Sequence, residues 1–331
     1  MRKLMIKSAE IDLELLCAGD RRTLAKTITL VESRLDSHRD EAKVILDSLL
    51  PSTGQSIRIG ITGPPGVGKS TFIEAFGLHL ISCGKKVAVL AVDPSSPVAG
   101  GSILADKTRM ETLSRHDSAF IRPSPSEGAL GGVAQKTRES MLLCEAAGYN
   151  VVLIETVGVG QSEYEVAGMV DFFMVLLLPN AGDEIQGLKK GIIELSDALI
   201  INKADGDFLN LAERTRLHYQ NALQLLRHPT HWTPRVMTCS SLESLNIDEV
   251  WKMIREYQLE TSQAQGHNCN PFYEKRSQQN RDWLHNLMHE MLLQKLHQNS
   301  QVQEQLPNLE QQVITGGITP YTAAKRIIDF L

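Results

Sequence analysis

A glycine-rich run in the first quarter of the chain has the composition of a phosphate-binding loop. Residues 63–70 read GPPGVGKS, which matches the pattern GxxxxGK[ST] at every fixed position. Glycines let the backbone curl so that successive N–H groups point at phosphate oxygens, and a following helix adds its positive amino end. The run predicts a nucleoside-triphosphate site. In it the Lys69 ammonium group places positive charge beside the β- and γ-phosphates, and the Ser70 hydroxyl binds Mg²⁺. The predicted contacts are Gly63, Pro64, Pro65, Gly66, Val67, Gly68, Lys69, Ser70 and Thr71.

The tetrapeptide NKAD at 202–205 predicts that the base of this nucleotide is guanine. A carboxylate at Asp205 can accept hydrogen bonds from both N1–H and the exocyclic amine of guanine. Adenine lacks that pair of donors, so ATP would leave the carboxylate unpaired. Such sites discriminate by roughly 10⁴-fold. An isolated match of this length would be better explained as a polar loop, and its place downstream of a phosphate loop is what favours guanine.

Neighbouring residues are expected to complete the base site. The Lys203 stem is predicted to pack over the base plane, and Asn202 is predicted to tie loops together. Residues Ser240, Ser241 and Leu242 follow the last predicted strand and resemble the loop that contacts the guanine carbonyl through backbone N–H groups.

A third segment, 151–158, is an apolar strand that ends in Glu155 and reaches Gly158 three residues later. In a phosphate-loop protein this pattern is typical of the sensor of Mg²⁺ and the γ-phosphate, where the Gly158 N–H reports hydrolysis. Gln161 is a candidate to orient the attacking water, although it lies farther along the chain than in the best-known small GTPases. Lys69, Glu155 and Gln161 are therefore the expected catalytic residues.

Four oxygen-bearing side chains are candidate Mg²⁺ ligands, because this hard cation prefers oxygen donors and keeps some of its waters. They are Ser70, Asp93, Asp106 and Glu155. A structural alternative exists for two of them: Asp93 could begin a turn and Asp106 could cap a helix. For Asp106, spacing alone favours neither interpretation.

The elements that must position these residues follow from the apolar pattern. Residues 1–50 show helical spacing, and from Ile57 short apolar runs alternate with helical segments. The alternation predicts a three-layer α/β domain with a mostly parallel sheet over residues 51–260. Residues 261–331 read as a linker followed by a helical arm. The predicted strands are 57–62, 87–92, 119–122, 151–155, 172–178, 198–202 and 236–239.

Composition narrows the class of protein. The 331 residues are 42% hydrophobic and carry a net charge of −5, which gives no basic footprint for nucleic acid or an anionic membrane. The five cysteines are scattered without a CxxC pair, so neither a disulfide framework nor a structural zinc site is expected. We read no secretion signal or membrane span and expect a cytoplasmic protein.

Long motifs resemble one family. The combination of GPPGVGKST, AVDPSSPVAGGSILADKTRM, ETVGVGQSE, PNAGDEIQGLKKG and NKAD closely resembles the MeaB/ArgK family of P-loop GTPases, which includes the methylmalonic aciduria type A protein. The resemblance covers nearly the whole chain. One departure is Ala105, where the family pattern has Gly, which should affect loop flexibility more than chemistry.

The resemblance implies more than the composition does. Members of the family have low intrinsic GTPase activity and act as G-protein chaperones of adenosylcobalamin-dependent acyl-CoA mutases, especially methylmalonyl-CoA mutase. They gate cofactor loading and protect the mutase from inactivation. They are homodimers in which the C-terminal helices form an arm. By motif matching, Asp93, Asp106 and Glu155 become Mg²⁺-linked acids, and residues 180–190 match an additional switch that communicates with the mutase.

The same sequence bears on three other functions. A nickel-delivery GTPase needs Cys–His pairs near its switches or a His-rich tail, and the chain shows neither. His285 and His289 are four residues apart on one helical face but lack the Glu of HExxH. A transport-linked ATPase or kinase conflicts with the NKAD motif. A structural protein that binds GTP without turnover stays open, because the sequence identifies no arginine finger.

Overall fold

The computed structural model of the chain describes residues 11–33, 35–92, 110–123, 130–156, 162–179, 190–224, 232–263 and 270–330. It divides into two compact units, of which the larger ends at Phe272 and the smaller begins at Tyr273. Within the residues that it describes, no helix is both long and apolar enough to cross a membrane.

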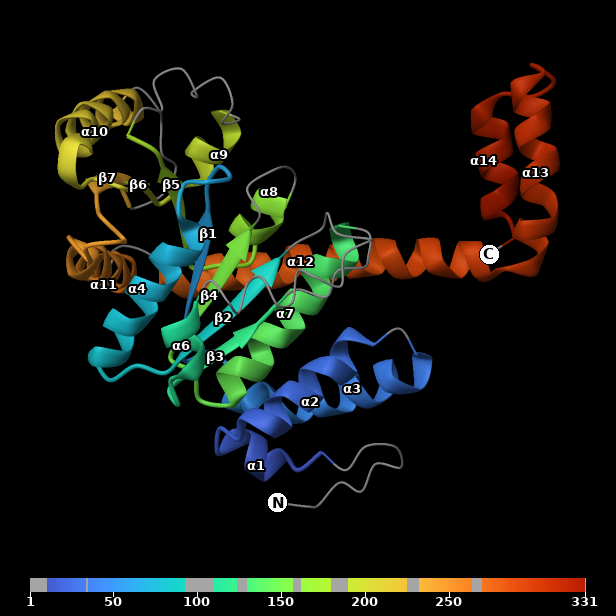
Figure 1. The fold of residues 1–331 in the computed structure, drawn as a ribbon. Helices are drawn as coiled ribbons and strands as arrows, with labels where there is room; N and C mark the ends of the chain where they lie inside the picture. The colour runs from blue at the N-terminus through green and yellow to red at the C-terminus, as the bar shows by residue number, and fades with distance from the viewer. Residues whose placement is uncertain are drawn as a thin grey trace. The chain divides into compact units, whose positions relative to one another are not determined.

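A sheet of seven strands forms the centre of the larger unit (Figure 1). All neighbouring strands pair in parallel, in the order β3-β2-β4-β1-β5-β6-β7. The predicted parallel sheet is thereby confirmed, and each strand agrees with its predicted range to within one residue at each end. The strands are β1 (Ile57–Thr62), β2 (Val87–Val92), β3 (Ala119–Arg122), β4 (Val151–Thr156), β5 (Phe172–Leu177), β6 (Ala198–Ile201) and β7 (Arg235–Thr238).

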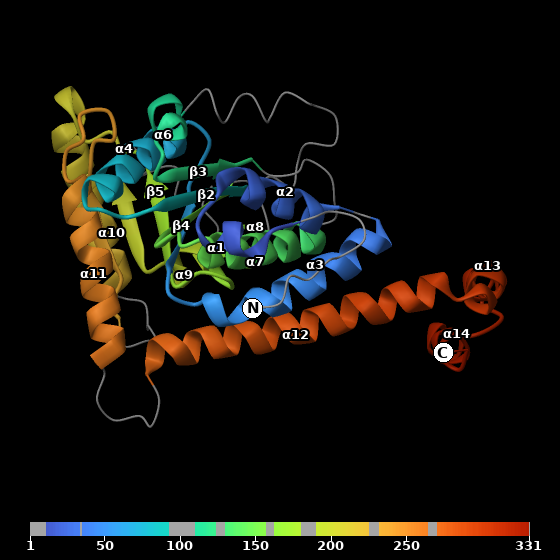
Figure 2. The same cartoon turned by 90° about the horizontal axis from the view of Figure 1, so that it is seen from below.

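Helices cover both faces of this sheet, which confirms the three-layer prediction (Figure 2). Alternate side chains of β4 point to opposite faces, with Leu153 in one buried cluster and Ile154 in the other. The Leu153 cluster is covered by α4 (Lys69–Ser82), α6 (Glu111–Arg115) and α11 (Ile247–Gln263). The Ile154 cluster is covered by α7 (Leu130–Ala146), α8 (Ser162–Ala167), α9 (Lys190–Leu195) and α10 (Leu209–Gln224).

The N-terminal helices add to the helices that cover the Ile154 cluster. They are α1 (Leu13–Cys17), α2 (Arg21–Glu32) and α3 (Asp36–Leu49), and a short turn, η1 (Leu50–Ser52), follows. Leu24, Ile28 and Val31 of α2 are buried in the same cluster as Leu143 of α7. The N-terminal helices are therefore part of the core of the larger unit and share its packing.

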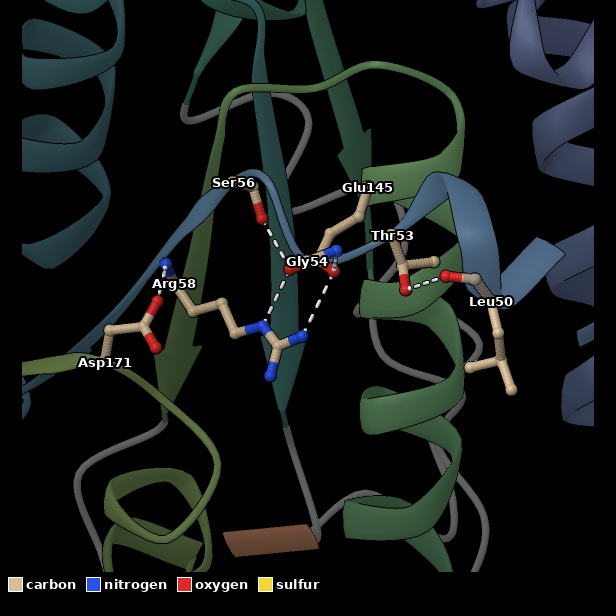
Figure 3. A network of polar contacts seen from close by, with 7 residues as sticks. All are labelled: Leu50, Thr53, Gly54, Ser56, Arg58, Glu145 and Asp171. Carbon is tan, nitrogen blue, oxygen red and sulfur yellow. Dashed lines mark hydrogen bonds and ion pairs between the residues drawn. The ribbon is translucent and has the colours of Figure 1, made fainter. Parts of the chain in front are cut away.

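A buried ion pair anchors the connection from these helices to β1 (Figure 3). The Arg58 side chain donates from Nε to Glu145 Oε1 at 2.7 Å and from Nη2 to Oε2 at 3.1 Å. The Ser56 hydroxyl and the Gly54 N–H donate to the same carboxylate. Burial acts to raise the pKa of Glu145, but these donors outweigh burial and hold its pKa below the ordinary value. The carboxylate thus joins the end of α7 to the start of β1.

The smaller unit has a core of its own. It contains most of α12 (Pro271–Gln298) together with α13 (Ser300–Ile314) and α14 (Pro320–Ile328). Val302, Leu309, Ala323 and Ile327 are buried between its helices. Thr319 caps α14 by accepting the Thr322 N–H at 3.2 Å, in front of a proline at the first helical position. The sequence predicted a linker and arm from residue 261, whereas α11 continues to Gln263 and the compact unit begins at Tyr273.

Candidate nucleotide-binding site

The predicted phosphate loop lies between β1 and α4, at the carboxyl edge of the sheet (Figure 1). Gly63 has a φ of 153°, and a Cβ there would lie 2.5 Å from the Leu176 carbonyl oxygen. Gly68 caps α4 in the left-handed conformation, and a Cβ there would lie 2.9 Å from Asn202 Nδ2. The Val67 side chain is fully buried in the core. These two glycines and the buried valine hold a tight curl directly before the helix.

The rest of the loop is accessible from solvent. Pro65, Gly66 and Thr71 are exposed, and Pro64, Lys69 and Ser70 are half-buried. The first N–H groups of α4 have no acceptor within the helix, as in any helix, and they add to its positive amino end. The loop and the helix therefore present backbone donors and positive potential at one place, which suits phosphate oxygens.

Lys69 lies over the curl of the loop. Its ammonium group donates to the Gly63 carbonyl at 2.7 Å and to the Pro64 carbonyl at 3.3 Å. Because the lysine is on the first turn of α4 and its stem folds back on the loop, the charge lies beside the loop amides. This is the position from which an ammonium group can reach phosphate oxygens.

Ser70 and Glu155 come together from different elements. Ser70 Oγ lies 3.5 Å from Glu155 Oε1, although the two residues are on α4 and β4. A hydroxyl and a carboxylate beside a phosphate loop fit Mg²⁺, which takes oxygen ligands and completes its octahedron with phosphates and water. The described residues contain no set of three His, Cys, Asp or Glu that could hold a metal ion by themselves.

Asn202 joins the base motif to the phosphate loop. It is 1% exposed and follows β6. Its Nδ2 donates to the Val67 carbonyl at 2.9 Å, and its Oδ1 accepts from the Ser241 N–H at 3.1 Å and the Ser241 hydroxyl at 2.7 Å. One side chain therefore connects three loops of the site.

Lys203 makes a second connection to the phosphate loop. Its φ of 58° is left-handed, which is uncommon for a residue with a side chain, and its ammonium group donates to the Gly66 carbonyl at 2.7 Å. The structure thus brings residues 202–203 and 63–68 together at two points. Asp205 is half-buried two residues further on.

The carboxylate of Asp205 is oriented by Ser240, whose hydroxyl donates to Oδ2. The Ser240 oxygen in turn accepts the Glu243 N–H at 3.1 Å, and the backbones of Ser240 and Leu245 exchange two hydrogen bonds. Leu242, at the tip of this loop, is 81% exposed. Because the Ser241 N–H already donates to Asn202, a contact of that N–H with a guanine carbonyl would have to share it.

Cys239 lies directly behind this loop and is fully buried. Its thiol is 3.5 Å from Asn202 Oδ1. Burial, helped by the negative charge of Asp205, raises the pKa of the thiol to about 12, against a smaller lowering by Ser241. The neutral thiol packs as a small apolar group and adds no charge to the base site.

Four predicted residues lie outside the part of the chain that the structure describes. They are Asp93, Asp106, Gly158 and Gln161, and residues 180–189 of the predicted additional switch lie outside it too. The described residues Lys69, Ser70, Glu155, Asn202, Lys203, Asp205 and Ser240 surround one region at the carboxyl edge of the sheet.

Sequence reasoning missed two interactions. Thr156 Oγ1 donates to Thr62 Oγ1 at 2.7 Å, and this buried bond joins the ends of β4 and β1 beneath the phosphate loop. The available signal was a threonine at the end of each of two apolar strands. The second was the Ser240 hydroxyl on Asp205, since only backbone groups of that loop were expected to act.

Known proteins are similar to this chain over nearly its whole length. A family model described as "Methylmalonyl Co-A mutase-associated GTPase MeaB" matches residues 24–301. The GTPase ArgK of Escherichia coli (strain K12) is 48% identical over 314 residues, which cover 95% of this chain and 93% of that protein.

Two further similar proteins extend the comparison. The mitochondrial methylmalonic aciduria type A homolog of Mus musculus is 44% identical over 324 residues, which cover 95% of this chain and 77% of that protein. A solved structure of a LAO/AO transport system kinase is 41% identical, with a TM-score of 0.76 over 96% of this chain and 95% of that one.

Proposed function

Because this chain belongs to the MeaB family of mutase-associated GTPases, we propose that it binds GTP with Mg²⁺ and hydrolyses it to GDP and phosphate. The observation that carries the proposal is the junction of the two motifs: Asn202 and Lys203 bond the phosphate loop at Val67 and Gly66. These two bonds support the proposal because they hold the residues assigned to guanine close to the residues assigned to phosphate, as binding of one nucleotide requires.

The residues have distinct roles in this proposal. The loop amides and Lys69 bind the β- and γ-phosphates and offset the charge that develops on them. Ser70 and Glu155, with Asp93 and Asp106, hold Mg²⁺ and its waters. When bound, the metal neutralises phosphate charge. Gly158 senses the γ-phosphate, Gln161 orients the attacking water, and Asp205 with the 240–242 loop reads guanine.

We also propose a client. The protein acts as a chaperone that gates cofactor loading into an adenosylcobalamin-dependent acyl-CoA mutase, with methylmalonyl-CoA mutase as the first candidate, and protects that enzyme. The support is the family description and the name of the mouse relative. In this proposal residues 180–190 contact the mutase when GTP is bound, and this contact accelerates GTP hydrolysis from a low intrinsic rate. The place of action is the cytoplasm.

We further propose a homodimer built on the smaller unit. The support is apolar surface within that unit. Leu284, Met288, Met291 and Leu292 on α12 are each at least half exposed. A cavity of about 600 Å³ between α13 and α14 is lined mainly by leucine, isoleucine, valine and alanine. Exposed apolar surface of this kind is typical of protein–protein contact sites.

A kinase linked to transport is a second candidate, which the name of the similar solved structure favours. It would require ATP. The pairing of Asp205 with Ser240 supports guanine instead, since it holds a carboxylate toward the base site. Nickel delivery, another alternative, would need soft or imidazole ligands near the switches.

One experiment tests the proposal. GTP hydrolysis is measured for the purified protein alone, with methylmalonyl-CoA mutase, and with ATP as control nucleotide. We expect slow turnover of GTP only, accelerated by the mutase, and none in Lys69→Ala. Equal turnover of ATP would contradict the base assignment, and GTP turnover without response to the mutase would contradict the client while leaving the GTPase assignment.

A further inference from the structure

A polar cluster joins the N-terminal helices to the sheet edge away from the base site. Glu32 is the last residue of α2, and Arg122 is the last residue of β3. Arg122 Nε donates to Glu32 Oε1 at 3.2 Å, and its Nη2 contacts Oε2 and donates to Thr29 Oγ1 at 3.2 Å. Lys136 on α7 donates to the backbone carbonyl of Glu32. We call Glu32, Arg122, Lys136 and Thr29 the α2 cluster.

Burial makes the α2 cluster more than a surface ion pair. The side chains of Glu32 and Arg122 are 10% and 25% exposed. Exposed pairs contribute little, whereas a largely buried pair is costly to break because one charge is left without its partner. The last turn of α2 carries no basic residue of its own, so the Lys136 ammonium supplies the positive charge that a helix carboxyl end favours.

The cluster lies at a place where the sheet needs an anchor. β3 is four residues long and, among the strands that the structure describes, lies at the edge of the sheet and pairs with β2. An edge strand has no neighbour on its outer side to fix its end. The Glu32–Arg122 pair ties this end to α2, and the side chains around it leave a cavity of only about 10 Å³, room for about one water.

The end of β3 that this pair anchors lies two strands away from Glu155, a proposed Mg²⁺ ligand of the nucleotide site. In the sheet register Arg122 lies opposite Leu90, and the next residue of β2, Ala91, lies opposite Glu155. Strands are spaced about 4.8 Å apart, so the Arg122 and Glu155 backbones are separated by roughly 10 Å. The chain leaves β2 at Val92 and continues directly to Asp93.

From this placement we propose that Glu32 is a positioning residue for Mg²⁺-dependent nucleotide binding. Through Arg122 it fixes the end of β3, which pairs with β2 where β2 borders Glu155. The N-terminal helices thereby take part in the metal side of the site. The inference rests on the proposed function, because it takes Glu155 as a Mg²⁺-linked acid.

Nucleotide binding tests the proposal without relying on turnover. Calorimetry measures the affinity for GDP in EDTA and for a non-hydrolysable GTP analogue with saturating Mg²⁺ and in EDTA. In Glu32→Gln and in Arg122→Met, we expect Mg²⁺ to tighten analogue binding by about tenfold less than in the unmodified chain, the loss of one charged hydrogen bond. The GDP affinity in EDTA should change less than about twofold, since the phosphate loop is untouched. Glu213→Gln, which removes the pair between the exposed Glu213 and the half-buried Arg216 on α10, is the matched control and should change neither quantity.

A double variant separates positioning from general destabilisation. If the two residues act as a pair, Glu32→Gln with Arg122→Met should lose no more Mg²⁺ linkage than either change alone. Unchanged Mg²⁺ linkage in both single variants, or an equal loss of GDP affinity in EDTA, would overturn the inference and leave the proposed function standing. If the unmodified chain binds the GTP analogue equally well with Mg²⁺ and in EDTA, the Mg²⁺ site of the proposed function is wrong, and so is the inference.

Discussion

Hydroxyl groups orient the side chains that we assign to the base. Ser241 donates to Asn202 Oδ1 at 2.7 Å, and Ser240 donates to Asp205. Both residues come from one loop after β7, and both acceptors come from the loop after β6. A carboxylate held by a neighbouring donor loses less rotational freedom on binding than a free one, so the two serines preorganise the site.

Changing the carboxylate should change the base. In Asp205→Asn an amide N–H faces position 2 of the purine, where guanine carries an amine and xanthine carries an oxygen. We expect the ratio of kcat/KM for XTP over GTP to rise by at least about 10². Turnover assays with GTP, XTP and ATP measure it. A variant that still prefers GTP would show that Asp205 does not read the base.

Removing the orienting hydroxyl should weaken binding without changing specificity. Ser240→Ala leaves Asp205 without its donor, and we expect the affinity for GDP to fall about tenfold, the value of one hydrogen bond to a charged group. Ser244→Ala, at an exposed position of the same loop, is the control. Equal affinities for the two variants in calorimetry would refute the orienting role.

At the scale of elements, the Arg58–Glu145 pair joins a strand, a helix and a connection at the amino end of the sheet (Figure 3). Arg58 also connects β1 to the start of β5, because its backbone N–H donates to Asp171 Oδ2 at 2.8 Å. The Asp171 carbonyl in turn accepts a hydrogen bond from the Tyr257 hydroxyl. The network lies at the end of the sheet opposite the nucleotide site. It should therefore act on stability and leave nucleotide chemistry unchanged.

Glu145→Gln should destabilise the larger unit by about 3 kcal/mol, because it leaves the buried Arg58 without its counter-charge. Trp232 and Trp251 report unfolding of this unit when Trp283 is replaced by Phe. Urea unfolding in that background measures the change. Glu249→Gln, from an exposed pair with Lys252, should cost less than about 1 kcal/mol. Equal midpoints for the two variants would contradict the role of the buried pair.

The same carboxylate predicts a pH dependence. The pKa of Glu145 is lower in the folded protein than in the unfolded chain, so its stabilisation is fully present above the unfolded pKa of about 4.5 and is lost as pH falls through the folded value. The free energy of unfolding should therefore fall more steeply in acid for the unmodified chain than for Glu145→Gln. Parallel slopes in urea titrations below that pH would rule this out.

Sequence alone predicted the elements well and their side-chain partners poorly. Buried parallel strands give continuous apolar runs, so β1 to β7 were visible, and the phosphate loop was fixed by its glycines and Lys69. The Glu32–Arg122 and Arg58–Glu145 pairs were invisible, because each joins residues far apart in the chain. A single sequence shows periodicity, but it does not show which charged residues far apart in the chain are in contact in the fold.

At the scale of the whole molecule, the same limit applies to the smaller unit. The sequence predicted a helical arm here, and in the structure the exposed residues Leu284, Met288, Met291 and Leu292 form an apolar stripe along α12. Periodicity gives the face of a helix but does not identify what covers it. The assignment of this surface to a second copy therefore stays a proposal.

The dimer proposal predicts that charged substitutions on α12 reduce the molecular mass of the particle in solution from that of a dimer to that of a monomer. Leu284→Glu with Met288→Glu places two charges on the stripe, and a charge buried in an apolar interface without a partner is strongly unfavourable. We expect light scattering to show a dimer for the unmodified chain and a monomer for this variant, with nucleotide affinity unchanged. Gln294→Glu, another exposed position on α12, should remain a dimer. A monomeric unmodified chain would refute the proposal.

The place of β1 in the sheet also has a consequence for biosynthesis. β1 is the first strand made, yet its two neighbours are β4 and β5, so it cannot pair until most of the sheet has been translated. At about 5–20 residues per second, the ribosome exposes this apolar strand and the phosphate loop for several seconds before a partner arrives. The nascent chain should therefore depend on cellular folding factors during that interval. GTP, whose proposed site includes Asp205 and residues 240–242, can assist only after β6 and β7 have emerged.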